Sequence, residues 1–188
     1  ALHYWMLLLK QRGDSQVREH ALQLALQLEN FRLAQELLKG LMQQRALDDH
    51  ELDTLVYVHE SLGSAAQAEA ELRAHTQRYP RQRQAWTLLL QHLENHRDYR
   101  AKVQLWQRMS RQFKLTPDER VEWAETWLAL QDAQAAWQVL DIDTRAIKSP
   151  AFWQARVRVA WELKLEQPLR QALERLLAIN GRLEEGDE

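Results

Sequence analysis

Two histidines and a glutamate in the segment HLENH have the spacing best suited to chemistry in this chain. His92 and His96 lie four positions apart, so a helix places them on one face, and Glu94 lies between them. Two such ligands can begin a metal site, but a stable site needs a third and a fourth ligand from elsewhere. The sequence offers no such set and contains no cysteine. We therefore interpret both histidines as surface or packing residues, and we expect no metal and no cofactor.

Catalytic signatures are missing from the sequence. It contains no nucleophile elbow, zinc-protease motif, phosphate-binding loop or dinucleotide fingerprint. The tripeptide RGD at residues 12–14 matches an adhesion signal, but we place it at a turn, where its glycine ends a helix. The sequence therefore predicts a protein that is not an enzyme.

Acidic and basic side chains are segregated along the chain, although the net charge is only −2. Residues 46–72 carry seven acids and no Lys or Arg, residues 73–114 carry ten bases and two acids, and residues 115–144 carry seven acids and one base. One interpretation is that neighbouring segments attract each other through exposed ion pairs, each worth ~0–1 kcal/mol. The other is that an acidic face binds a cationic partner. No basic stripe runs the length of the chain, which argues against nucleic acid.

The helices that position these residues follow from a period of 34 residues. Small residues recur at Ala34, Ala68 and Ala136, and four positions after each the sequence has a leucine, at Leu38, Leu72 and Leu140. An earlier stripe in each period comprises Ala21, Leu55, Leu89 and Trp123. Apolar residues at helical spacing predict two helices and a turn in each period, with a core formed between neighbouring periods. A Thr-Pro start at residues 116–117, with a glutamate three positions after the threonine, predicts a capping box.

This pattern resembles the tetratricopeptide repeat, a helix-turn-helix of 34 residues with small residues at set positions. Lys102 departs from it, because it stands where other periods carry a small residue. The resemblance implies a right-handed, all-α solenoid with units at 15–48, 49–82, 83–116, 117–150 and 151–181. The fifth unit fits if two residues are inserted near residues 141–150. Residues 1–13 would be the second helix of a truncated unit, and residues 182–188 a tail.

The resemblance also implies a groove lined by the first helix of each unit. We expect the acidic and aromatic residues of those helices to bind a partner or a polymer there. This candidate set is Asp53, Tyr57, Glu60, Glu94, Asp118, Glu122, Glu125 and Trp161. An alternative basic patch, which would receive an acidic partner, is Arg97, Arg100, Arg108 and Arg111. We expect most of the eight tryptophans to pack in the core, including Trp86, Trp106, Trp123 and Trp127.

The function implied is a binding scaffold. The Trp-, Gln- and Arg-rich composition and the loose fit to the consensus are similar to the periplasmic repeat region of bacterial outer-membrane exopolysaccharide export proteins of the Pel type. Such a protein would dock a periplasmic polysaccharide deacetylase or hydrolase, or guide a partly deacetylated, cationic polymer. No stretch of this chain is long and apolar enough to span a bilayer, so membrane attachment would lie elsewhere in the parent protein.

The alternative is a co-chaperone or assembly scaffold, cytoplasmic or periplasmic, that binds a peptide or a partner protein. Clamps for a peptide carboxylate usually present Lys and Arg in the groove. The central units of this chain present mainly Glu, Asp, Gln and Thr at those positions, which argues against such a clamp.

Overall fold

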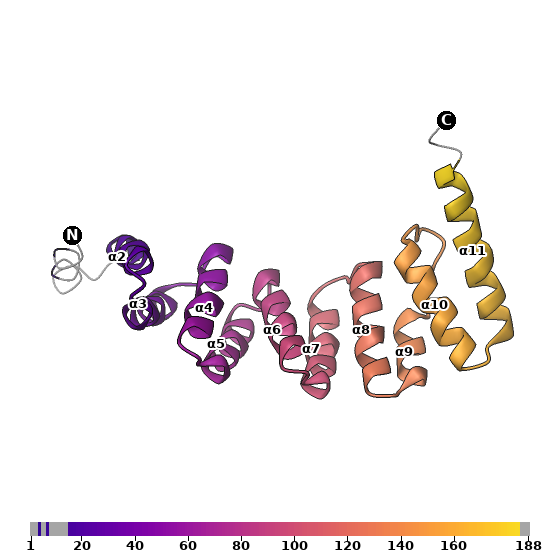
Figure 1. Cartoon of the computed structure of the whole chain (residues 1–188), viewed down its shortest axis with the longest axis horizontal. Helices are drawn as coiled ribbons and strands as arrows, with labels where there is room; N and C mark the ends of the chain where they lie inside the picture. The colour runs from indigo at the N-terminus through magenta and orange to yellow at the C-terminus, as the bar shows by residue number, and fades with distance from the viewer. Residues whose placement is uncertain (1–3, 5–6, 8–14, 185–188) are drawn as a thin grey trace. The chain divides into compact units, whose positions relative to one another are not determined.

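The chain folds into helices joined by short connections, and residues 15–184 contain no strand (Figure 1). The computed structural model describes residues 4, 7 and 15–184, with side chains to residue 179. The predicted helix at residues 1–13, the RGD tripeptide and the end of the predicted tail fall wholly or largely outside the described residues. The helices are α2 (Ser15–Gln27), α3 (Phe31–Gln44), α4 (Asp49–Ser61), α5 (Ala65–Arg78), α6 (Arg83–Asn95), α7 (Tyr99–Gln112), α8 (Pro117–Ala129), α9 (Ala133–Leu140), α10 (Pro150–Glu162) and α11 (Glu166–Glu184).

Within each helix pair the turn contains one residue with a positive φ. These residues are Glu29, Gly63, Arg97, Gln131 and Lys164, with φ between 52° and 64°. They follow one another at intervals of 34, 34, 34 and 33 residues, so the repeat is visible in the backbone itself. The predicted two-residue insertion before the fifth pair is therefore wrong, because this pair begins one residue early.

The physical reason for this error is the side chain at position 156. With the 33-residue step, Arg156 takes the helix position that Leu89 and Trp123 take in earlier pairs, and it is buried at 5% exposure. Its guanidinium lies over the ring of Trp137, at 4.4 Å from the centroid, and donates to the Leu140 carbonyl oxygen. An arginine at a position that is apolar in earlier pairs hides the repeat in the sequence, although the helix itself still follows the repeat.

Helix starts follow the local sequence signals. Thr116 accepts a hydrogen bond from the Glu119 backbone N–H, and the Glu119 carboxylate accepts one from the Thr116 N–H, so the predicted capping box is confirmed. Asp48 and Glu51 form a second capping box at the start of α4. Ser149 caps α10, with a proline at the first helical position. These caps satisfy backbone donors that have no partner inside the helix.

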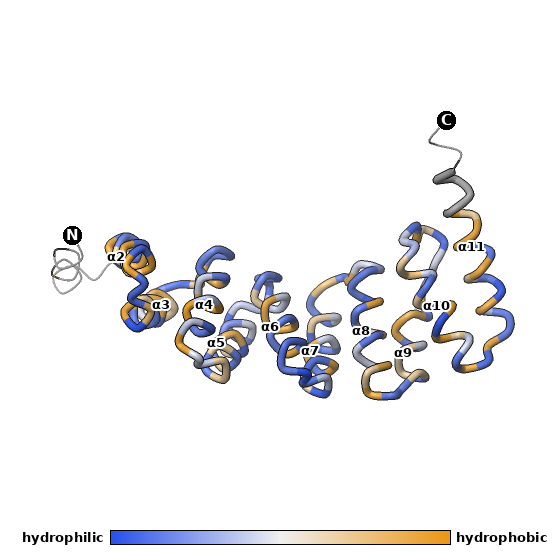
Figure 2. The backbone as a smooth tube through the Cα atoms, viewed as in Figure 1, coloured by the Kyte–Doolittle hydropathy of each residue, from blue (hydrophilic) through white to orange (hydrophobic). Residues whose placement is uncertain are grey.

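The chain divides into two compact units, Ala1–His92 and Leu93–Glu188. In the first unit α2 packs on α3, α3 on α4 and α4 on α5. Ala34 and Ala68 are fully buried, as are Leu38 and Leu72, which confirms the predicted packing positions. Figure 2 shows apolar and polar residues alternating along each helix, as expected where one face of a helix is buried.

In the second unit α8 packs on α7, α9 and α10, and α11 packs on α10. Its core includes Ala136, Leu140, Phe152 and Trp153. Trp106 is buried as predicted, whereas Trp123 and Trp127 are only partly buried and pack at the edge of the core. Helix α9 has eight residues, against 14 in each of α3, α5 and α7.

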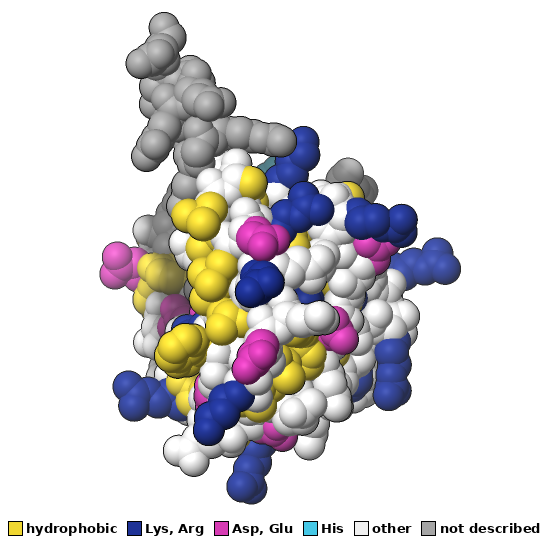
Figure 3. Space-filling view, turned by 90° about the vertical axis from the view of Figure 1, so that its right-hand side faces the viewer, with side chains coloured by type: hydrophobic (Ala, Val, Ile, Leu, Met, Phe, Trp, Pro, Cys, Tyr) yellow, Lys and Arg dark blue, Asp and Glu magenta, His cyan; other side chains and the backbone are white. Residues whose placement is uncertain are grey.

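Helix α11 carries an apolar stripe that is not fully covered. Leu173 and Leu177 are 42% and 70% exposed. Figure 3, which faces this end of the second unit, shows apolar side chains running between charged ones. In the part of the chain that the structure describes, no helix is both long and apolar enough to cross a membrane.

Candidate functional site

An acidic cleft of about 300 Å³ opens in the second unit, and it contains three of the predicted groove residues. Glu94 comes from the end of α6, and Glu122 and Glu125 come from successive turns of α8. The remaining lining residues are Tyr99, Lys102, Thr126 and Ala129. We call this site the acidic cleft. Three carboxylates and one ammonium group line it, so its formal charge is negative.

Lys102 holds one of these carboxylates. Its Nζ lies 2.5 Å from a Glu94 carboxylate oxygen, and the lysine side chain is only 9% exposed, against 48% for Glu94. Lys102 occupies the position that is alanine in three other pairs, so its stem crosses the packed region between helices. Its ammonium then emerges at the cleft, as expected for a long side chain with a buried stem and a polar end.

The surroundings of Glu122 in the acidic cleft disfavour its ionised form. Partial burial raises the pKa of its carboxyl above the ordinary 4.5, and the nearby charges of Glu119, Glu125 and Glu94 act in the same direction. The ammonium of Lys102 opposes these effects. The site is therefore short of positive charge, and a cation entering it would stabilise the ionised form of Glu122.

A second hollow of about 410 Å³ adjoins the acidic cleft through Glu125. It is also lined by Leu128, Gln131, Arg158 and Glu162. Arg158 Nη2 lies 3.4 Å from a Glu125 oxygen, and both side chains are about half exposed. Trp161 lies on the same helix as Arg158 and is 73% exposed, so it is a surface tryptophan and not a core residue.

The other predicted acidic residues do not line the acidic cleft. Asp53, Tyr57 and Glu60 lie exposed on α4 in the first unit. Asp53 accepts a hydrogen bond from Gln84 Nε2 at 2.8 Å, and the Tyr57 ring packs edge-on against Phe31. Asp118 lies at the start of α8 and accepts a 2.6 Å hydrogen bond from the Ser149 hydroxyl.

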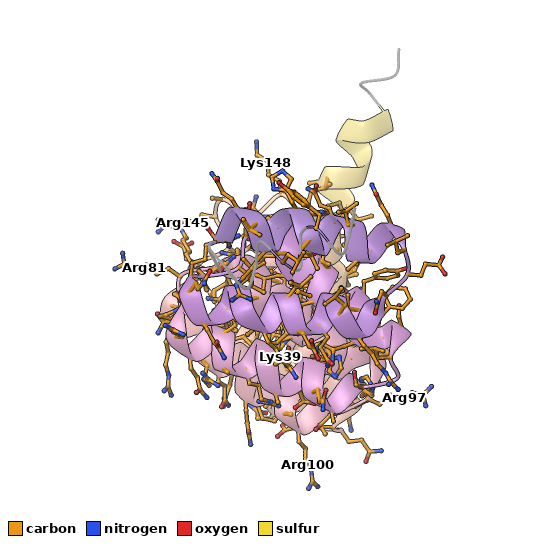
Figure 4. All side chains as sticks on the ribbon, turned by 90° about the vertical axis from the view of Figure 1, so that its left-hand side faces the viewer. Lys39, Arg81, Arg97, Arg100, Arg145 and Lys148 are labelled. Carbon is orange, nitrogen blue, oxygen red and sulfur yellow. The ribbon has the colours of Figure 1, made fainter. Side chains whose placement is uncertain are left out.

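The predicted basic patch is scattered around α7. Arg97 is the left-handed residue of the turn before this helix, and Arg100 lies in its first turn. Figure 4 shows both side chains pointing outward. Arg108 is partly buried, and Arg111 lines a different cleft, which is described below.

The two histidines of HLENH differ in their exposure. His92 is buried, with Nε2 3.8 Å from a Glu69 oxygen, whereas His96 is exposed. Among the described residues no group of three or more His, Cys, Asp or Glu is arranged to hold a metal ion.

Sequence reasoning missed four lining residues of the acidic cleft, which are Tyr99, Lys102, Thr126 and Ala129. Of these four, only Lys102 stood out in the sequence, as a departure from the small-residue pattern. The departure itself was the available signal. A lysine in a packing position must find a partner for its ammonium, and the acids of the preceding and following helices were the nearest candidates.

Comparisons with known proteins support the repeat architecture. A family model described as "Tetratricopeptide repeat" matches residues 108–188. No curated protein matches the chain. These comparisons do not test the narrower resemblance to exopolysaccharide export proteins, which stays a prediction.

Solved structures extend the likeness over most of the chain. A crystal structure of the protein MamA is 12% identical, with 91% of this chain and 94% of that chain covered and a TM-score of 0.63. The C-terminal part of a TPR repeat-containing protein from Cytophaga hutchinsonii is 12% identical, with 96% and 73% covered and a TM-score of 0.65. YrrB, described as a TPR protein with an unusual peptide-binding site, is 13% identical, with 87% and 81% covered and a TM-score of 0.51. The chain therefore has the all-α, solenoid-type fold of tetratricopeptide repeat proteins.

Proposed function

We propose that this chain is a non-catalytic interaction scaffold that binds an amine-bearing partner at the acidic cleft. The observation that carries the proposal is the meeting of Glu94, Glu122 and Glu125 around one hollow with a single lysine. Carboxylates that outnumber the ammonium groups around them favour a cationic ligand. A tetratricopeptide-type fold suits this role, because stacked repeats present extended binding surfaces.

The finer form of the proposal is a segment of a Pel-type exopolysaccharide export protein such as PelB. In this role the chain lies in the periplasm, as part of an outer-membrane protein. The ammonium groups of a partly deacetylated amino-sugar polymer would meet the carboxylates of the acidic cleft. A basic face of a periplasmic deacetylase or hydrolase would meet the same groups, because lysine carries the same ammonium chemistry.

The rival proposal is a co-chaperone or assembly scaffold that binds a peptide or a partner protein. YrrB, whose fold is similar, is described as having a peptide-binding site. A basic peptide would fit the acidic cleft, whereas the free carboxylate of a peptide C-terminus would be repelled by it. The two proposals therefore share the site and differ in the ligand.

The test compares binding of a chitosan oligomer, its fully acetylated counterpart and an oligolysine peptide to the 188-residue chain by calorimetry. The double variant Glu122→Gln/Glu125→Gln should weaken binding of the cationic ligands. Glu166→Gln/Glu174→Gln, an equal charge change at exposed positions of α11, should leave it unchanged. The attraction should also fade as the Debye length falls from ~10 Å at 0.1 M salt to ~3 Å at 1 M.

Each result separates one proposal from another. Chitosan binding that depends on Glu122 and Glu125 supports the guidance of a cationic polymer in the export role. Oligolysine binding without chitosan binding supports a basic protein or peptide partner, as in the scaffold proposal or in docking of a modifying enzyme. The variant Asp53→Asn/Glu60→Gln tests whether the acidic residues of α4 contribute separately. Equal weakening by the α8 and α11 variants would show that only overall charge matters, and the acidic cleft would then be refuted as a site.

A further inference from the structure

A second cleft in the Leu93–Glu188 unit has the opposite character to the acidic cleft. It has a volume of about 430 Å³, and its lining includes Gln107, Arg111, Arg120, Trp123, Trp127 and Gln138. Two of these residues are arginines and two are tryptophans, and no carboxylate lines the cleft. We call it the aromatic-basic cleft.

Helix α8 supplies residues to both clefts from different sides. Arg120, Trp123 and Trp127 are spaced by three and four positions, so they share one face of the helix. Glu122 and Glu125 belong to another face, which lines the acidic cleft. The aromatic-basic cleft is completed by residues of α7 and α9, the second helices of their pairs. It is therefore separate from the groove expected along the first helices.

The two arginines of the aromatic-basic cleft are not neutralised. Neither Arg111 nor Arg120 forms an ion pair within the described residues. Arg111 is exposed, and Arg120 Nη1 donates to the Val139 carbonyl oxygen at 3.0 Å. Arg120 is partly buried with no carboxylate paired to it among the described residues, and this burial lowers the pKa of its guanidinium. A carboxylate ligand would supply the missing charge, in the planar geometry that guanidinium prefers.

The tryptophans give this cleft an apolar side. Trp123 stacks on buried Trp106, with centroids 6.5 Å apart and an angle of 16° between the rings. Its indole nitrogen is buried and has no hydrogen-bond partner within the described structure. Gln107 on α7 and Gln138 on α9 are both exposed, and each side-chain amide can donate and accept hydrogen bonds.

We propose that the aromatic-basic cleft binds an acidic peptide segment of a protein partner. Side-chain carboxylates of the peptide pair with Arg111 and Arg120, its backbone amides bond to Gln107 and Gln138, and its apolar groups lie against the tryptophans. A peptide carries carboxylates, backbone amides and apolar side chains together, which are the groups that the arginines, glutamines and tryptophans of this lining can bind. The proposal is independent of the acidic cleft, and together the two sites would let one unit bind two partners of opposite charge.

The test uses a fluorescent, N-acetylated hexaglutamate peptide and the 188-residue chain, with binding read by anisotropy at low ionic strength. Arg111→Gln should weaken binding by up to about fivefold, the effect expected for loss of one exposed ion pair. Arg100→Gln is the matched control on the same helix and should leave binding nearly unchanged.

A second pair of variants adds charge to the cleft instead of removing it. Gln138→Glu places a carboxylate in the lining and should weaken binding, whereas Gln154→Glu, at an exposed position of α10, should not. The four single substitutions lie at exposed positions, which are Arg100, Arg111, Gln138 and Gln154. The variants should therefore fold, and circular dichroism checks that they do. Glu122→Gln/Glu125→Gln should not weaken hexaglutamate binding, which separates this site from the acidic cleft.

Three results would overturn the proposal. One is equal weakening by Arg111→Gln and Arg100→Gln, which would indicate diffuse electrostatic attraction. Another is binding of trigalacturonate with the same dependence on Arg111 but no binding of hexaglutamate, which would assign the cleft to an anionic sugar. The third is the absence of hexaglutamate binding at low ionic strength, where the Debye length of ~30 Å should favour it most.

Discussion

Removal of Lys102 and removal of Glu94, which form an ion pair, should change the free energy of unfolding by different amounts. The Lys102 side chain is 9% exposed and the Glu94 side chain is 48% exposed. Replacing Lys102 by Met keeps most of the apolar stem and leaves a carboxylate that water already reaches. We expect this change to cost ~0–1 kcal/mol in the free energy of unfolding, as for a surface pair.

Replacing Glu94 by Gln leaves a largely buried ammonium with a weaker partner. Breaking a fully buried pair costs ~3–5 kcal/mol. Here Nζ lines a cleft open to water, Glu122 is nearby, and the glutamine oxygen still accepts a hydrogen bond, so we expect about 1–2 kcal/mol. For a chain of this length that corresponds to a fall in Tm of roughly 2–8 °C.

Urea and thermal unfolding, followed by circular dichroism at neutral pH, measure both changes. The exposed pair formed by Arg158 and Glu125 is the control, because Arg158→Met and Glu125→Gln should each cost ~0–1 kcal/mol. If Lys102→Met destabilises the chain as much as Glu94→Gln does, then the ammonium is not the buried partner and the description of the acidic cleft is wrong.

Three further predictions concern packing, backbone and pH. Ala68→Leu should overpack the contact between helices and cost ~1–3 kcal/mol in unfolding experiments, whereas Ala70→Leu, at an exposed position of the same helix, should be nearly neutral. Gln131→Gly should raise the free energy of unfolding by up to ~1 kcal/mol, because the position has φ 61° and glycine relieves the left-handed strain; a lower free energy of unfolding would refute this. Because the pKa of Glu122 is raised in the folded chain, its protonated carboxyl contributes to the free energy of unfolding. This stabilisation is fully present below the ordinary pKa of 4.5 and is lost as pH rises through the higher folded value. Glu122→Gln should therefore gain stability relative to the parent chain between pH 4 and pH 7 in urea titrations, and parallel curves would contradict the raised pKa.

The helices were predictable because their signals are local and repeat at a fixed interval. A buried alanine at positions 34, 68 and 136 and a capping box at Thr116 each leave a mark in the sequence. The fifth pair was misaligned because Arg156 is stabilised by the Trp137 ring and the Leu140 carbonyl, contacts that no periodic pattern records. The spacing of apolar residues identifies the buried stripe of a helix, but it does not show where a charged side chain is buried together with its partners.

The candidate site was predictable only in part, because charge along the sequence does not specify which charges meet. The acidic segment at residues 115–144 and the basic segment at residues 73–114 suggested one face of each sign. In the structure Lys102 joins three glutamates in one cleft, while Arg111 and Arg120 share another with no acid. The division falls across a single helix, because residues three or four positions apart on α8 face one side and the residues between them face another. Selectivity for two oppositely charged partners would then depend on the orientation of α8, and a helix held by packing on α7, α9 and α10 is well placed to fix it.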